Sequence, residues 1–146
     1  MKHPLILGAD HAGFELKEQL KKILLQQGEQ IEDASPAFIK DDDYPLVAQR
    51  VAYAVSRKTG AYGILICGSG LGMDIAANRF HGIRATLVRT PEEACLAREH
   101  THANILVLGA WITPLARAKN ILTTWLHTSE SRAKRHLRRV EQLDAL

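Results

Sequence analysis

Apolar runs alternate with amphipathic stretches along the whole chain. Short, uninterrupted apolar runs are typical of strands that are buried on both faces of a sheet. Apolar spacings of three and four residues, as between Leu16, Leu20 and Ile23, are typical of one buried helix face. The pattern predicts strands at residues 5–7, 30–32, 63–67, 83–88 and 105–108, and helices at residues 14–25, 44–57, 75–79, 92–100 and 114–126.

This order of elements favours an α/β protein with a parallel sheet that is covered by helices on both faces. A chain of 146 residues is long enough for a single hydrophobic core, so one domain spanning residues 1–146 is expected. The sequence contains no internal repeat, low-complexity segment or linker.

Composition narrows the class of protein further. Apolar residues make up 46% and charged residues 24% of the chain, which is typical of a globular protein and not of a disordered one. No apolar run approaches the roughly 20 residues that a membrane helix needs. Asp10 follows the short apolar run at residues 4–8 at once, which argues against a secretory signal. Two cysteines cannot form a disulfide framework, so we expect a cytoplasmic protein.

The formal net charge is +3, and much of the basic excess lies near the C-terminus. The cluster consists of Arg132, Lys134, Arg135, His136, Arg138 and Arg139. Such a cluster can bind nucleic acid or a phosphorylated small molecule, or it can simply be solvated. Aromatic residues are not interleaved with these charges, which disfavours nucleic-acid binding.

Ligands of open parallel sheets bind outside the carboxyl ends of the strands. This rule directs attention to residues 9–13, residues 67–72 and the segment after residue 108. In the first of these, Asp10 and His11 could hold hydroxyl groups or a phosphate. Alternatively, Asp10 serves only to cap the following helix.

The second segment, Cys67-Gly68-Ser69-Gly70-Leu71-Gly72, closes a predicted strand and leads toward a helix. Its glycines allow close approach of a ligand, and amides at a helix start stabilise negative charge. It is neither a dinucleotide fingerprint nor a P-loop. A thiol in this position is predicted to have a depressed pKa, although a buried structural cysteine fits the position equally well. Cys95, beside Leu96 on a helix face, fits the core.

His100 and His102 flank Thr101 just before the last predicted strand. A His-x-His pair suggests a metal, but no third ligand has convincing spacing. A histidine near a site entrance is better interpreted as an acid–base group, because its pKa lies near neutrality. We therefore expect no metal and no cofactor.

Five motifs occur along the chain in the order found in one known family. They are Gly8-Ala9-Asp10-His11-Ala12-Gly13, Asp43-Tyr44-Pro45, the cysteine–glycine turn with Ile75-Ala76-Ala77-Asn78, His100 with Asn104, and Arg135-His136 with Arg139. Together they resemble ribose-5-phosphate isomerase type B, of the family that also holds galactose-6-phosphate isomerase. The resemblance covers nearly the whole chain, and the turn followed by Ile-Ala-Ala-Asn is specific.

The resemblance implies a three-layer αβα sandwich with a Rossmann-like parallel sheet of about five strands and a C-terminal helical tail. It also implies an aldose–ketose isomerase that interconverts ribose 5-phosphate and ribulose 5-phosphate, without a metal. The protein would be a homodimer, or a tetramer, with its sites at the subunit interface. Binding to nucleic acid or to a membrane is not expected.

The same resemblance implies roles for individual residues. Cys67 would be the base that moves the proton, and His100 of the partner subunit would be the acid that opens the sugar ring. The developing enediolate oxygen would be held by Gly68, Ser69, Gly70, Leu71 and Gly72. Substrate contacts would come from Asp10, His11, Tyr44, Asn78 and Thr101, and phosphate contacts from Arg135 and Arg139. Some family members place a glutamate base just after the turn, where this chain has Met73.

Four positions depart from the family pattern, and two of them, Ala133 and Lys134, replace glycines before Arg135, the first arginine of the tail motif. Thr101 stands where the family usually has asparagine, and Trp111 stands where it usually has arginine. The alternatives are therefore another sugar-phosphate substrate (allose 6-phosphate, galactose 6-phosphate or a tetrose phosphate) or a non-catalytic regulator that binds a phosphorylated sugar.

Overall fold

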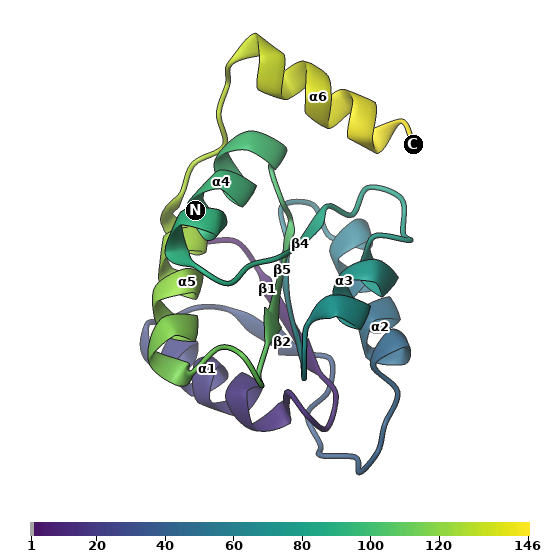
Figure 1. Cartoon of the computed structure of the whole chain (residues 1–146), viewed down its shortest axis with the longest axis vertical. Coiled ribbons are helices and arrows are strands. Elements are labelled where there is room, and N and C mark those ends of the chain that lie inside the picture. Colours follow the sequence, from purple (N-terminus) through teal and green to yellow (C-terminus); the bar gives the residue numbers. More distant parts are fainter. Residues whose placement is uncertain (1) are drawn as a thin grey trace.

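The computed structural model describes residues 2–146, and its strands and helices alternate from the first strand to the fifth helix (Figure 1). The strands are β1 (Leu5–Ala9), β2 (Ile31–Asp33), β3 (Tyr62–Cys67), β4 (Ala85–Leu87) and β5 (Ile105–Gly109). The helices are α1 (Phe14–Gln26), α2 (Tyr44–Arg57), α3 (Leu71–Ala77), α4 (Pro91–Thr101), α5 (Leu115–His127) and α6 (Lys134–Asp144).

The five strands form one parallel sheet in the order β2-β1-β3-β5-β4. Leu5 pairs with Tyr62, and Cys67 pairs with Gly109, so β1, β3 and β5 end at the same edge. This arrangement confirms the predicted three-layer α/β fold with a parallel sheet of five strands. The carboxyl ends of the three central strands are therefore the first place to search for a site.

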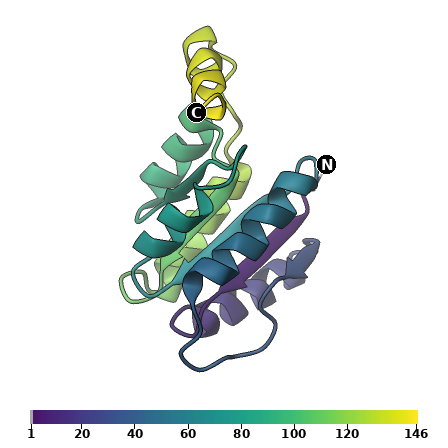
Figure 2. The same ribbon diagram turned by 90° about the vertical axis from the view of Figure 1, so that its right-hand side faces the viewer.

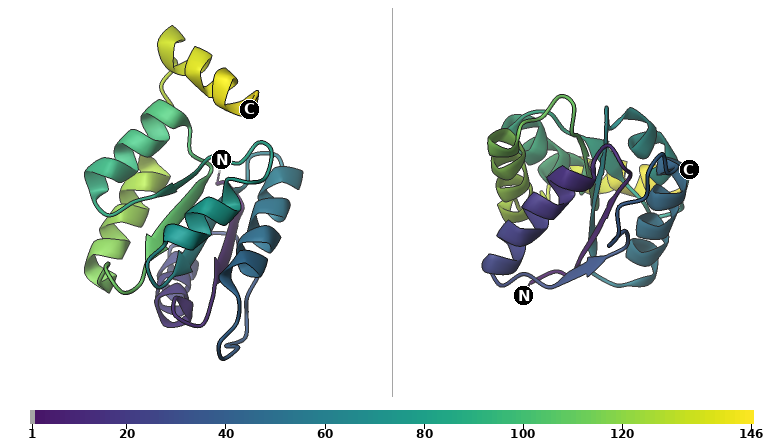
Figure 3. Two further views of the ribbon diagram at one scale, coloured as in Figure 1. Left: turned by 45° about the vertical axis from the view of Figure 1, so that its right-hand side comes forward. Right: turned by 90° about the horizontal axis from the view of Figure 1, so that it is seen from below.

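Each face of the sheet is covered by its own set of helices (Figure 3). One face packs against α1, α4 and α5, around the fully buried Trp125. The other face packs against α2 and α3, where Cys67 lies near Met73 and Val47 in one apolar cluster. Because both faces are covered, the central strands read as continuous apolar runs in the sequence.

The start of α3 differs from the prediction, which placed this helix at residues 75–79. The helix begins at Leu71, directly after Gly70, whose φ of 81° lies in the left-handed region that glycine adopts without strain. It ends at Ala77, and the side chain of Asn78, the next residue, bonds both the N–H and the C=O of Ala85. The glycine turn thus leads straight into α3, and no irregular segment separates them.

The C-terminal helix α6 stands apart from the sandwich and contacts it mainly through α4 (Figure 2). The guanidinium of Arg84 binds the Asp144 carboxylate near the end of α6, at 2.6 and 2.8 Å. In Figure 1 this helix lies at the end of the molecule opposite the loops that follow β1, β3 and β5. The predicted helical tail is therefore confirmed, and it lies far from the carboxyl edge of the sheet.

Candidate active site

Three loops meet at the carboxyl edge of the sheet, after β1, β3 and β5. The Asp10 amide donates to the Ile66 carbonyl at 3.3 Å, and the Ala110 amide donates to the Cys67 carbonyl at 2.8 Å. These bonds join the first and third loops to the end of β3. The structure thus brings together Asp10, His11 and the glycine turn, as the sequence predicted from their places after adjacent strands.

Cys67 is buried at the mouth of the glycine turn. Its Sγ accepts a hydrogen bond from the Gly70 amide at 3.2 Å. Burial raises the pKa of the Cys67 thiol, and the amides of Met73 and Gly70 lower it by less. The predicted depression of this pKa is therefore wrong, because the packing of α2 and α3 removes the thiol from water. Cys95 is only half-buried, so it is not the fully enclosed core residue that was expected.

Tyr44 reaches the glycine turn from α2. A Cβ atom at Gly72 would clash with the Tyr44 ring, so the ring lies directly on the backbone there. Any larger residue at position 72 would displace the ring. The structure therefore places Tyr44 in the predicted site, on the side of α2 and α3.

Asp10 and His11 differ in exposure and in partners. The Asp10 carboxylate is buried and accepts a bond from the Gly13 amide at 3.0 Å, and burial raises its pKa. The His11 ring is exposed, and its Nδ1 lies 3.1 Å from Oδ1 of Asp42. This hydrogen bond is the main reason that the pKa of His11 is raised. His11 is thereby suited to carry positive charge at the site entrance.

Asp42 itself was not predicted as a site residue. Its Oδ1 also accepts the His11 backbone amide at 2.7 Å, so it fixes the loop after β1. The run Asp41-Asp42-Asp43 just before Tyr44 was visible in the sequence as an acidic loop. Nothing in that run indicated which carboxylate would face His11, because the contact spans 31 residues.

A buried ionic network lies behind the loop that carries Asp10. The Lys17 side chain is 0% exposed, and its Nζ donates to both carboxylate oxygens of Asp33 and to the Ser35 carbonyl. Ser35 in turn accepts the Ala9 amide on its Oγ at 2.9 Å. The network thus fixes the end of β1 immediately before Asp10.

We expect Lys17→Met to lower the free energy of unfolding by about 1–3 kcal/mol, because it leaves the buried Ser35 carbonyl without its donor and the Asp33 carboxylate with Lys21 as its remaining cation. Lys21→Met is the matched control, since Lys21 binds the same carboxylate at 2.7 Å from a position 25% exposed to solvent. Lys21→Met should lower the free energy of unfolding by at most about 1 kcal/mol. Urea unfolding of both variants measures the difference. Equal decreases in the free energy of unfolding would contradict the assignment of Lys17 as the buried lysine of this ionic network.

His100, Arg135 and Arg139 lie at the other end of the molecule. His100 belongs to the last turn of α4, which leads into the amino end of β5. Its ring packs on His136 of α6, with ring centroids 4.3 Å apart. Because β5 alone spans roughly 13 Å, the His100 ring and Cys67 of one chain cannot reach the same substrate carbons. The structure does not bring these two predicted catalytic residues together within one chain.

Two further predicted substrate contacts have their polar groups engaged within the chain. The Thr101 hydroxyl donates to the Ala97 carbonyl at 2.6 Å. The Asn78 amide bonds Ala85 on both sides and ties α3 to β4. Both residues remain candidate substrate contacts because the family resemblance implies that role. In this structure their side chains stabilise α4 and the connection of α3 to β4.

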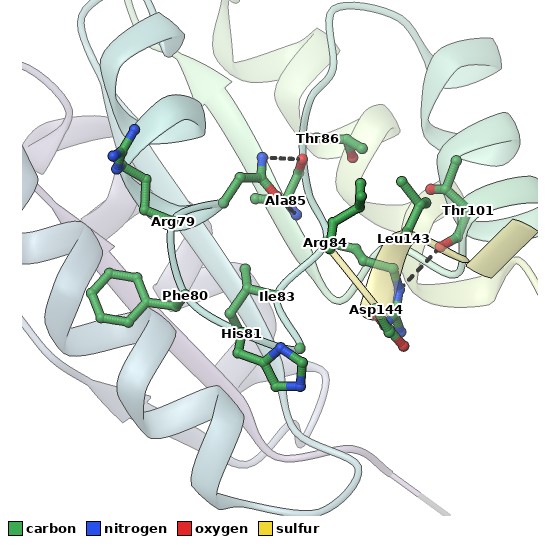
Figure 4. Close-up of a pocket in the computed structure, with 13 residues that line it drawn as sticks. Arg79, Phe80, His81, Ile83, Arg84, Ala85, Thr86, Thr101, Leu143 and Asp144 are labelled. Atoms are coloured by element: carbon green, nitrogen blue, oxygen red, sulfur yellow. Dashed lines mark hydrogen bonds and ion pairs between the residues drawn. The ribbon is translucent and has the colours of Figure 1, made fainter. Parts of the chain in front are cut away.

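A cavity lies beside α6, at the amino end of β5, and not at Cys67. It has a volume of about 560 Å³ and is lined by residues 78–86, which run from the end of α3 into β4, by Thr101 and by the C-terminal residues Leu143, Asp144 and Leu146. Arg84 lies there between Thr101 and Asp144 (Figure 4). A second cavity of about 490 Å³, beside the first, is lined by His100, His136 and Arg139.

Residues 2–146 contain neither a candidate metal-ion cluster nor a membrane-spanning helix. No cluster of three histidine, cysteine or carboxylate side chains in this range has the geometry to hold a metal ion. Within the same range, every helix is too short or too polar to cross a bilayer.

Comparison with known proteins gives one consistent result. Residues 5–143 match the profile of the family described as Ribose/Galactose Isomerase. The ribose-5-phosphate isomerase B of Escherichia coli is 39% identical over 142 residues, which cover 97% of this chain and 95% of that protein. A ribose 5-phosphate isomerase structure from Thermotoga maritima matches with a TM-score of 0.94, at 41% identity over the full length of both chains. That of the Mycoplasma genitalium enzyme with bound ribulose-5-phosphate matches with a TM-score of 0.88, at 32% identity over 99% of this chain and 96% of that one.

Proposed function

Since the chain belongs to the ribose/galactose isomerase family, we propose that it interconverts ribose 5-phosphate and ribulose 5-phosphate, with Cys67 as the base. The observation that carries this assignment is the place of Cys67, between the buried Asp10 carboxylate and the amides of the glycine turn. The Mycoplasma genitalium relative, which holds ribulose-5-phosphate, supports the choice of substrate. A coupled assay with ribose 5-phosphate and with the alternative hexose and tetrose phosphates tests it. Conversion of another sugar phosphate, without turnover of ribose 5-phosphate, would overturn the choice.

The proposed reaction moves one proton between neighbouring carbons. The Cys67 thiolate removes the proton from C2 of the open aldose, and an enediolate forms. The thiol then returns the proton to C1, while the hydroxyl proton is transferred between the two oxygens. Amides of the glycine turn face the developing oxyanion, and each such donor stabilises the transition state by about 3–4 kcal/mol. The raised pKa of Cys67 makes its thiolate scarcer but a stronger base toward a carbon acid.

We infer that the site is completed by a second copy of the chain. His100 and the α6 arginines would act with Cys67, but they lie at the opposite edge of the sheet. A homodimer that places His100 of one copy near Cys67 of the other resolves this separation. His100 would then supply the proton that opens the sugar ring.

The exposed side of α2 and α3 is the surface best suited to this contact. Leu71 and Ile75 on α3 are 61% and 65% exposed, and Leu46 and Tyr53 on α2 are exposed beside them. Such a set of large apolar side chains on adjacent helices is typical of a subunit interface. Because α3 begins at the glycine turn, a partner docked here lies next to Cys67.

We expect Arg135→Ala and Arg139→Ala each to raise the KM for ribose 5-phosphate about tenfold or more. Each change removes a charge-assisted contact to phosphate, worth about 1.5–3 kcal/mol. Arg138→Ala is the matched control, since Arg138 is exposed on the same helix. Steady-state kinetics measures the effect, and a KM unchanged from the parent would remove that arginine from phosphate binding.

The rival function is a regulator that binds a phosphorylated sugar without converting it. A regulator would use the glycine turn and the arginines to bind the sugar phosphate, but it would not need Cys67 as a base. NMR in deuterated water separates the two, because an isomerase exchanges the carbon-bound proton of its substrate with solvent. We expect exchange, and its absence under saturating ribose 5-phosphate would favour the regulator.

The proposed setting is the cytoplasm, where a phosphorylated sugar substrate is available. The reaction as written needs neither a metal nor an organic cofactor, since Cys67 carries the carbon-bound proton and the hydroxyl proton moves between the two substrate oxygens.

A further inference from the structure

The two tryptophans of the chain lie in opposite environments. Trp125 is 0% exposed at the centre of the core, whereas Trp111 is 77% exposed and is the most exposed aromatic residue of those described. Trp111 lies two residues after the end of β5, at the carboxyl edge of the sheet, in the third loop of the candidate site. Ile112, the next residue, is 54% exposed as well, and an exposed apolar group of this kind beside the thiol that we propose as the base indicates a surface that a ligand covers.

The indole of Trp111 is held in place by the glycine turn. A Cβ atom at Gly68 would lie only 2.5 Å from Cε2 and Cζ2 of the ring, so the ring lies flat on the Gly68 backbone. The Trp111 amide donates to the Gly68 carbonyl at 2.9 Å, and the Ala110 amide donates to the Cys67 carbonyl at 2.8 Å. Trp111 is thus anchored, through its own and the preceding residue, to Gly68 and Cys67.

The loop after Trp111 is also closed. The amides of Ile112 and Thr113 both donate to the Gly109 carbonyl, at 3.1 and 2.9 Å. The ring therefore sits on a short, hydrogen-bonded loop and keeps one face against Gly68. Its other face is free for contact, and little conformational entropy is lost when that face is covered.

We propose that the outer face of the Trp111 indole is a wall of the substrate pocket, against which the carbon chain of the sugar packs. This inference rests on the proposed function. A sugar phosphate presents C–H groups along its chain, and these suit a flat aromatic face. The phosphate group is strongly hydrated and does not suit it. The wall would therefore recognise the sugar and not the phosphate, and would hold the carbons beside Cys67.

Acrylamide quenching of tryptophan fluorescence in the full-length protein tests the proposal directly. Acrylamide reaches Trp111 and not the buried Trp125, so the quenchable signal reports on Trp111. Saturating ribose 5-phosphate should lower the quenching constant at least about twofold, and inorganic phosphate should leave it unchanged. Equal protection by phosphate, or no protection while ribose 5-phosphate is turned over, would overturn the proposal.

Two variants supply an independent readout. Trp111→Phe keeps a flat aromatic face, so kcat/KM for ribose 5-phosphate should stay within about threefold of the parent, whereas Trp111→Ala should lose about tenfold or more. Near-ultraviolet circular dichroism and Tm check that both variants fold. An alanine variant as active as the parent would overturn the proposal. A parent without ribose 5-phosphate activity would overturn the proposed function instead. The quenching assay, repeated with the other sugar phosphates, would then show whether Trp111 still forms a wall of the substrate pocket.

Discussion

Cys67→Ser should lower kcat for ribose 5-phosphate isomerisation by at least about a hundredfold, the lower range for loss of a positioned acid–base group. A serine hydroxyl is far less acidic than a thiol, so no usable base is left beside the substrate carbons. The change is nearly isosteric, and Oγ can still accept the Gly70 amide that Sγ accepts at 3.2 Å. The fold and the KM should therefore change little while kcat collapses.

Cys95→Ser is the control for this experiment, because Cys95 is the other free thiol and lies on α4, away from the glycine turn. Its kcat should match the parent within about twofold, as for other substitutions away from the site. If Cys67→Ser kept activity within a few-fold of the parent, Cys67 would not be the base.

The raised pKa of Cys67 adds a pH dependence to this expectation. Because burial favours the neutral thiol, the fraction of thiolate increases as pH rises toward a pKa above that of an ordinary cysteine. In the Cys95→Ser background, the rate of alkylation by iodoacetamide should therefore still be rising at the pH where a free cysteine has levelled off. A rate that is already constant at neutral pH would show a depressed pKa instead.

The double variant Leu71→Lys, Ile75→Lys should be monomeric and should lose at least about a hundredfold in kcat/KM. Two charges placed on the apolar side of α3 would have to be desolvated in the proposed interface, which costs several kcal/mol per ion. A monomer holds Cys67 without a neighbouring His100, so the ring-opening acid is absent. Light scattering and steady-state kinetics on the same sample measure both losses.

Leu25→Lys is the matched control, since Leu25 is 53% exposed on α1, which covers the other face of the sheet. It should remain a dimer with parental activity. A double variant that is monomeric and fully active would show that each chain carries a complete site.

The sequence pattern predicted the sheet and most helices because the central strands are apolar on both faces. The helix predicted at residues 44–57 agrees with α2 at both ends. Pro91 begins α4, because the fixed φ of proline favours the first position of a helix. The start of α3 was predicted four residues too late. Its first turn contains Gly72 and follows a left-handed Gly70, so apolar periodicity is weakest where the helix begins.

The sequence allowed prediction of which loops form the site, but not of the contacts between them. The places of Asp10, His11 and Cys67 after adjacent strands follow from topology. The pairing of His11 with Asp42, and the contact of Trp111 with Gly68, depend on packing between segments that are 31 and more than 40 residues apart. The pKa of Cys67 could not be predicted either, because a local view of the turn amides leaves out the burial imposed by α2 and α3.

The central claim is that Cys67 and His100 act together from different chains, and subunit complementation tests it most directly. Cys67→Ser and His100→Asn are each inactive by this account. When equal amounts are unfolded together and refolded, half of the dimers are mixed, and each mixed dimer has one intact site and one doubly altered site. Activity should therefore return to about a quarter of the parental value. A mixture that stays as inactive as its two components would contradict the shared site.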